Sequence, residues 1–138
     1  MRYEIGICIA TGWICWINGP FPSGFGNDRD IAELSLHHML GDGEGYIADG
    51  VYRRIMGVAR TPTGNHRYSD RKEQEARARH ETVNSLLKNF GCLGNRFRHD
   101  REDHYFFFAP CALMVQLMLE DGRGTFQVTY DERLFDDR

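Results

Sequence analysis

The sequence predicts one α/β domain, and three observations lead to this prediction. The 138 residues suffice for a single hydrophobic core and include no apolar run long enough to span a membrane. A period-two apolar pattern near the N-terminus predicts strands, whereas the segments 70–90 and 100–120 have the composition of helices. We therefore expect one domain over residues 1–138, with no membrane as partner.

The N-terminal segment predicts a β-hairpin. Apolar and other residues alternate over 3–10, and 13–18 is rich in aromatic and β-branched residues, with Thr11-Gly12 as a tight turn between them. Residues 19–26 hold two prolines and three glycines, which predicts a loop.

A helix is expected next, through Ile31 to Leu40, with Asp28 or Asp30 as its N-cap. Residues 45–48 form a short apolar piece that leads directly into Asp49, which places this carboxylate at a strand end.

The second half of the chain predicts two long helices and a late strand. Residues 70–90 contain no glycine or proline and predict the longest helix, stopped at Gly91. Residues 100–120 predict an apolar helix that bends or begins near Pro110, and 125–130 predict a strand before a frayed end.

The four cysteines predict reduced thiols. Cys8, Cys15, Cys92 and Cys111 lie far apart and form no CxxC pair. This spacing favours core thiols over a disulfide framework and indicates an intracellular protein.

Charge is distributed unevenly along the chain. Residues 60–101 carry ten Lys/Arg against five Asp/Glu, a local charge of +5, although the whole chain has a net charge of −3. Such a segment can attract a polyanion, or it can be an ordinary solvated helix with mixed charges.

The longest predicted helix presents one polar face opposite its apolar stripe. Spacings of four, three and four residues place a set of polar side chains on one side: Arg77, Glu81, Asn84 and Lys88. The face can be a plain surface with an i,i+4 ion pair. It can also present a carboxylate flanked by cations.

Two roles are possible for Asp49. An aspartate followed by glycine often begins a turn, and a carboxylate at a strand end is also a common ligand position. If the strand carboxylate and the helix carboxylate of Glu81 met over a sheet, they could bind Mg²⁺ or Mn²⁺, because hard cations prefer such oxygens.

Several strings together resemble the DDE superfamily endonucleases, the catalytic domain of Harbinger-type transposases. They are residues 2–9 (RYEIGICI), 12–24 (GWICWINGPFPSG), 48–52 (ADGVY), 79–84 (RHETVN), 97–100 (FRHD) and 126–130 (FQVTY). The resemblance extends over roughly residues 2–130 and rests on the order and spacing of the strings.

The resemblance implies an RNase H-like mixed sheet with flanking helices and three acidic metal ligands. Asp49 stands at the position of the second aspartate and Glu81 at that of the glutamate, so these two would be catalytic and would bind Mg²⁺ or Mn²⁺. Arg77, Glu81 and Lys88 fit an R-x3-E-x6-K signature of related transposases, although Gln74 replaces its opening tyrosine. Asp28 and Asn84 would be accessory.

The same resemblance implies DNA as partner and the nucleus as location. The reaction would be metal-dependent phosphodiester hydrolysis and strand transfer, with a set of cations on the DNA phosphates: Arg77, Lys88, Arg96 and Arg98. The stretch Tyr105-Phe106-Phe107-Phe108 could stack on bases, but as the start of an apolar helix it is expected in the core.

One feature departs from the family. The first aspartate of the family precedes the equivalent of Arg2, so the first strand and the first ligand are missing and little independent cleavage is expected. A sheet without that strand exposes an edge, so we expect the chain either to pair with another copy as a homo-oligomer or to be only marginally stable. The alternatives are a non-catalytic, transposon-derived module that binds DNA or protein, and a decayed reading frame without function.

Overall fold

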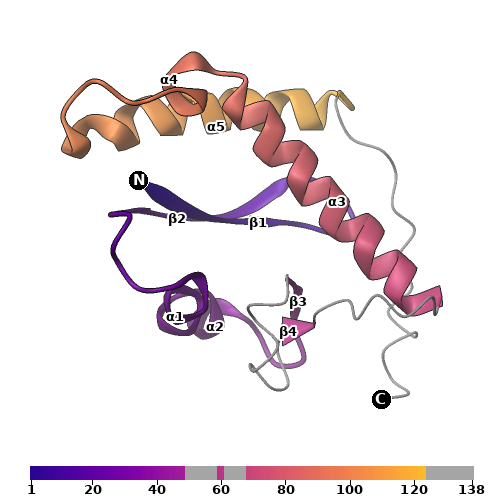
Figure 1. Ribbon diagram of the computed structural model, residues 1–138. Helices are drawn as coiled ribbons and strands as arrows, with labels where there is room; N and C mark the ends of the chain where they lie inside the picture. Colours follow the sequence, from indigo (N-terminus) through magenta and orange to yellow (C-terminus); the bar gives the residue numbers. More distant parts are fainter. Residues whose placement is uncertain (49–58, 61–67, 124–138) are drawn as a thin grey trace. The chain divides into compact units, whose positions relative to one another are not determined.

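The computed structural model describes residues 1–48, 59–60 and 68–123 of the chain (Figure 1). Asp49, the predicted strand 125–130 and the C-terminal end lie outside the described residues. The described chain forms two compact units, one of residues 1–25 with 79–123 and one of residues 26–48, 59–60 and 68–78. Each unit is considered by itself.

The predicted hairpin is confirmed. β1 (Arg2–Ile7) pairs antiparallel with β2 (Ile14–Phe21), and the Cys8 amide donates to the Trp13 carbonyl at 2.9 Å beyond the strand ends. Gly12 adopts φ +78°, a left-handed conformation that favours glycine, which explains its place in the turn.

The expected loop after residue 18 begins later than predicted. β2 continues to Phe21, which pairs with Arg2, and so it contains Pro20. Proline is compatible with this position because β2 has no second neighbouring strand within the described residues, so that its outer edge does not require a donor there.

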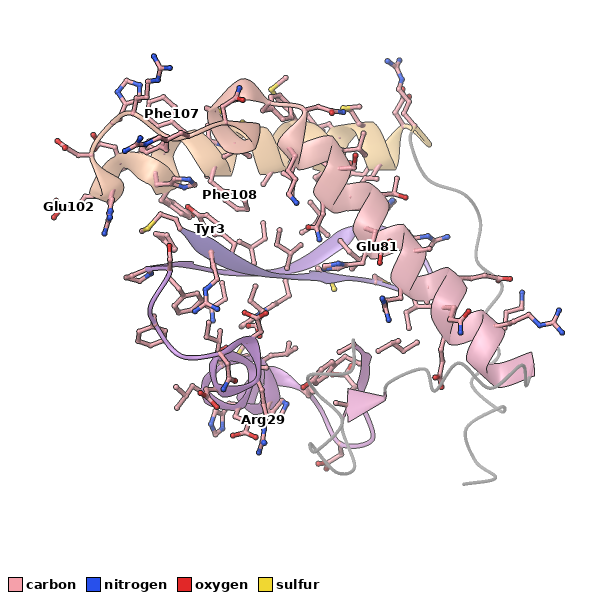
Figure 2. All side chains as sticks on the ribbon, viewed as in Figure 1. Tyr3, Arg29, Glu81, Glu102, Phe107 and Phe108 are labelled. Atoms are coloured by element: carbon pink, nitrogen blue, oxygen red, sulfur yellow. The ribbon has the colours of Figure 1, made fainter. Side chains whose placement is uncertain are left out.

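Helix α5 (His104–Glu120) packs on the inner face of this hairpin. The Tyr3 ring stacks on Phe108 with the ring centroids 3.6 Å apart and an interplanar angle of 7°, and its hydroxyl lies 2.8 Å from Nδ1 of His104. Figure 2 shows Phe108 extending from α5 toward Tyr3. The Ile14 amide donates to Oε1 of Gln116 at 2.8 Å, so both strands are attached to α5.

Helix α3 (Tyr68–Lys88) contributes its C-terminal half to the same core. Its predicted apolar stripe is confirmed, since Val83 and Leu87 are buried and Leu86 and Phe90 pack against them. The buried core cluster consists of Val83, Leu87, Phe108, Ala112, Val115 and Leu119. Tyr3, Ile5 and Ile7 pack on this cluster, as the period-two pattern predicts.

The boundaries of the two long helices differ in detail from the prediction. α3 ends at Lys88, and Gly91 begins the short α4 (Gly91–Gly94) instead of capping the long helix. α5 is preceded by a 3₁₀ turn, η2 (Arg101–Asp103), and contains Pro110 in its interior, so the alternative of a start near Pro110 is wrong.

Helix α5 is apolar on both sides. Phe106 is 72% exposed, Leu113 61% and Leu117 56%, and these residues lie about 180° around the helix from the buried stripe. The side chain of Phe108 is buried, whereas Tyr105, Phe106 and Phe107 are exposed. The expectation that the whole aromatic stretch lies in the core is therefore wrong for three of its four residues, because successive residues point in different directions on a helix.

The other unit begins with a capped helix, and the cap differs from the prediction. Asn27 caps α1 (Asp28–Leu34): its side chain accepts from the Asp30 amide at 2.9 Å, and Asp30 Oδ2 accepts from the Asn27 amide. Asp28 and Asp30 therefore lie in the first turn. The predicted helix to Leu40 is interrupted at Ser35, whose hydroxyl donates to the Ile31 carbonyl.

Beyond Ser35 this unit contains α2 (Leu36–Met39) and two short parallel strands. β3 (Tyr46–Ile47) pairs with β4 (Ala59–Arg60), and β3 confirms the short strand expected before Asp49. Strands and helices in both units confirm the mixed α/β class. Among the described helices, none is both long and apolar enough to cross a membrane.

The four cysteines are free, but their environments differ from the expected core positions. Cys111 alone is buried; Cys8 and Cys92 are half-buried and Cys15 is exposed. Cys15 lies between Ile14 and Trp16 on β2, and alternation along the strand turns it away from the face on which Ile14 packs against the core.

The burial of His104 predicts a pH-dependent stability. Burial lowers the pKa of His104 below its ordinary value of 6.5, and the positive N-terminal amino group acts in the same direction. Between these two pKa values the unfolded chain binds more protons than the folded chain, so the free energy of unfolding falls as the pH drops below about 6.5 and levels off below the folded pKa. Urea unfolding at a series of pH values measures this decline. The decline should be smaller in His104→Asn than in the unaltered protein, and equal declines in the two would contradict this prediction.

Candidate functional site

The C-terminal half of α3 is attached to the hairpin by two consecutive side chains. Arg79, only 3% exposed, donates from Nη1 to the Ile9 carbonyl at 2.8 Å. His80 lies 2.8 Å from the Ile5 carbonyl through Nε2. A carbonyl only accepts, so His80 donates from Nε2, and its Nδ1 accepts from the Asn84 amide at 3.2 Å. These bonds fix the rotation of this part of α3.

Glu81 follows these two anchors and is exposed (Figure 2). Of the other polar-face residues, Lys88 is exposed and Arg77 and Asn84 are half-buried. Asn84, expected as an accessory residue, orients the His80 ring. Asp28, the other expected accessory residue, is exposed in the first turn of α1. Asp49 lies outside the described residues, so its convergence with Glu81 stays a prediction.

The described residues do not form the metal centre that the resemblance implies. Within residues 1–48, 59–60 and 68–123, no group of three or more His, Cys, Asp or Glu side chains could hold an ion together. Glu81 contributes one carboxylate, and a Mg²⁺ or Mn²⁺ site requires several oxygen ligands.

A second feature of the same unit is a hollow of about 450 Å³ beside α4. It is lined by Gly91, Cys92, Asn95, Arg96, Phe97, Arg98 and His99. Two of the four cations predicted to bind phosphate, Arg96 and Arg98, are thus brought to one place, and both are exposed.

Phe97 explains why these two arginines face outward. Its ring packs against the core-facing His104, with the centroids 4.6 Å apart, and against Phe107 at 5.3 Å. Phe107 in turn stacks on His99 at 5.0 Å, with an interplanar angle of 14°. Because Phe97 is held against α5 and its two neighbours are exposed, Arg96 and Arg98 flank it on the solvent side.

The lining of the hollow is suited to an anion. Two guanidinium groups present several N–H donors each, and the Asn95 amide and the His99 ring add polar atoms, whereas none of the lining residues is acidic. Guanidinium groups bind phosphate oxygens through paired hydrogen bonds. The arrangement can bind a phosphate group.

Sequence reasoning missed the buried polar anchors Arg79 and His104. Arg79 lies four residues before Val83 and so extends the apolar stripe by one turn, a signal that could have placed it against the core. Burial lowers the pKa of Arg79. No family model, curated protein or solved structure matches the chain.

The close approach of Arg79 to the hairpin turn predicts a specific cost for a side chain at position 12. A Cβ on Gly12 would lie 3.2 Å from the Arg79 side chain and would also require φ +78°. We expect Gly12→Ala to lower the free energy of unfolding by about 1–3 kcal/mol, as measured by urea unfolding.

Gly122→Ala is the matched control. Gly122 has φ +77° and its Cβ would meet nothing within 4 Å, so this variant has the backbone strain alone. The loss in Gly12→Ala should exceed that in Gly122→Ala. Equal losses would show that contact with Arg79 does not contribute.

Proposed function

We propose that this chain is a DNA-contacting domain of the DDE endonuclease class that does not cleave DNA by itself. The observation that carries the proposal is the hollow beside α4, where Arg96, Arg98 and His99 lie together without an acidic neighbour in the lining. The ordered strings shared with Harbinger-type transposases support the assignment to this class, with its RNase H-like sheet.

Phosphate recognition follows from the chemistry of this lining. A guanidinium group retains its positive charge at any pH at which DNA is bound, and two of them with outward-facing side chains can contact neighbouring backbone phosphates. Such contacts release counterions and bind DNA regardless of its sequence. The hollow is therefore suited to a polyanion that carries phosphate groups.

The carboxylates support a cleavage chemistry that this chain cannot complete alone. The resemblance assigns Asp49 and Glu81 to metal binding, whereas a two-ion mechanism in this class uses three acidic residues. The resemblance identifies two of these three acidic residues in the 138 residues of the chain. The second candidate function is a non-catalytic, transposon-derived module that binds DNA or protein, in which neither Asp49 nor Glu81 binds a metal ion.

Loss of the arginines should weaken DNA binding in a salt-dependent manner. We expect Arg96→Ala and Arg98→Ala each to lower the affinity for a duplex and to reduce the slope of log K against log salt by about one per lost phosphate contact. Fluorescence anisotropy of a labelled duplex at several KCl concentrations measures both quantities.

Arg123→Ala is the charge-matched control for this experiment. Arg123 is exposed near the opposite end of α5 and pairs with Asp121 at 2.7 Å, outside the hollow. Its loss changes the net charge equally and should leave the salt slope unchanged. If all three variants weakened binding equally, binding would reflect net charge and the proposed site would be wrong.

Cleavage is tested separately on supercoiled plasmid with Mg²⁺ or Mn²⁺. We expect the chain to produce no more nicked plasmid than Glu81→Gln, because the resemblance assigns metal binding to only two of its carboxylates, Asp49 and Glu81. Gel quantification of nicked circles over time measures this. Nicking that Glu81→Gln abolishes would show that two carboxylates suffice, whereas nicking that survives in Glu81→Gln would come from another source.

A further inference from the structure

Two cysteines from different helices meet at the inner wall of the hollow. Sγ of Cys92, on α4, lies 3.7 Å from Sγ of Cys111, on α5, and both thiols are free. Cys92 lines the hollow and is half-buried, whereas Cys111 is 7% exposed and belongs to the packed side of α5. One thiol is therefore accessible from solvent and the other lies directly behind it.

We propose that Cys92 and Cys111 form a redox-sensitive dithiol that small anionic disulfides convert into an intramolecular disulfide. The contact distance between the two sulfurs is the main argument, because thiols this close need only a small side-chain rotation to reach bonding distance. The proposal does not depend on DNA binding, since it concerns the thiols and an oxidant.

The positions of the two thiols indicate that Cys92 reacts first and Cys111 second. Cys92 loses its proton, and its sulfur attacks one sulfur of the external disulfide; that S–S bond breaks, and the leaving thiolate takes up a proton. Cys111 then loses its proton and attacks the Cys92 sulfur of the mixed disulfide, which releases the second external thiol. In total, two protein thiols are oxidised and one external disulfide is reduced to two thiols.

The surroundings favour this sequence over reaction at Cys111 first. Burial raises the pKa of the Cys111 thiol to about 11, with a further contribution from its contact with Cys92, so Cys111 is a poor nucleophile toward solutes. The second step nevertheless proceeds within the protein, where the two sulfurs are held together. Arg96 and Arg98 line the same hollow and attract an oxidant that carries carboxylates.

The other two cysteines provide the internal comparison. Cys8 and Cys15 lie on the hairpin, where burial and, to a smaller extent, the nearby Cys8 raise the pKa of Cys15. Trypsin separates the pairs clearly: Cys92 falls in peptide 89–96 and Cys111 in peptide 102–123, whereas Cys8 and Cys15 share peptide 3–29. A Cys92–Cys111 disulfide therefore joins two peptides.

The test treats the folded full chain with oxidised glutathione, blocks remaining thiols with an alkylating agent, and analyses tryptic peptides without reduction by mass spectrometry. We expect joined peptides 89–96 and 102–123, loss of alkylation at both cysteines, and full reversal by dithiothreitol. The variant Cys8→Ser/Cys15→Ser should behave identically, because it retains the proposed pair. Cys92→Ser should yield no joined peptide and leave Cys111 free for alkylation after unfolding.

Three results would overturn the proposal. The first is that both cysteines stay alkylatable after equilibration with the oxidant. The second is that glutathione remains attached to Cys92 while Cys111 stays a thiol. The same treatment in concentrated urea, where four cysteines allow three pairings, should give a mixture of joined peptides. A folded sample with that same mixture would also contradict the proposal, because it would show that the fold does not select the pair.

Discussion

The stacking of Tyr3 on Phe108, with the hydrogen bond from Tyr3 to His104, joins the start of the chain to its last described helix. A two-stranded hairpin is marginally stable alone, because it cannot bury its own apolar face. Here Tyr3, Ile5 and Ile7 find that cover on α5 and on the C-terminal half of α3. The hairpin is therefore held by contacts with a helix about a hundred residues away, whereas the buried cluster itself lies within residues 83–119.

The packing of the hairpin against α5 and α3 also orients the polar residues at this contact. Burial raises the pKa of Tyr3 to about 12, so its hydroxyl remains protonated and available as the donor to a neutral His104. Arg79 and His80 donate to backbone carbonyls of the hairpin region, which sets the rotation of α3 and turns Glu81 to solvent. A buried cation requires such a partner, since its desolvation is otherwise costly. Glu81 is thus exposed because its two predecessors are engaged.

The elements of this fold were predictable where local periodicity determines them. The hairpin, the long helix and the stripe from Val83 to Phe90 follow from alternation and helical spacing. The helix boundaries were less predictable. Asn27, Asp28 and Asp30 are all suitable N-cap residues for α1, and only the backbone geometry selects Asn27.

The candidate site was predictable only in part. Arg96 and Arg98 were assigned to phosphate through a resemblance, but the hollow that unites them depends on how Phe97 packs against α5, a tertiary contact without a local signal. The pairing of Cys92 with Cys111 is hidden for the same reason: nineteen residues separate them, and only the packing of α4 against α5 brings them together. Asp49 and Glu81 remain a prediction from the order of motifs.

The two features of the hollow have a common structural origin. Phe97 and Phe107 pack against each other and thereby hold the segment after α4 against α5, which places the arginines on the outer side. The same packing keeps α4 close to α5, which brings Cys92 to Cys111 on the inner side. A disulfide at this position would tie the wall that carries Arg96 and Arg98 to the helix behind it. The wall therefore carries the two arginines on its outer side and Cys92 on its inner side, and Leu93 of α4, which packs on the core cluster, also holds it in place.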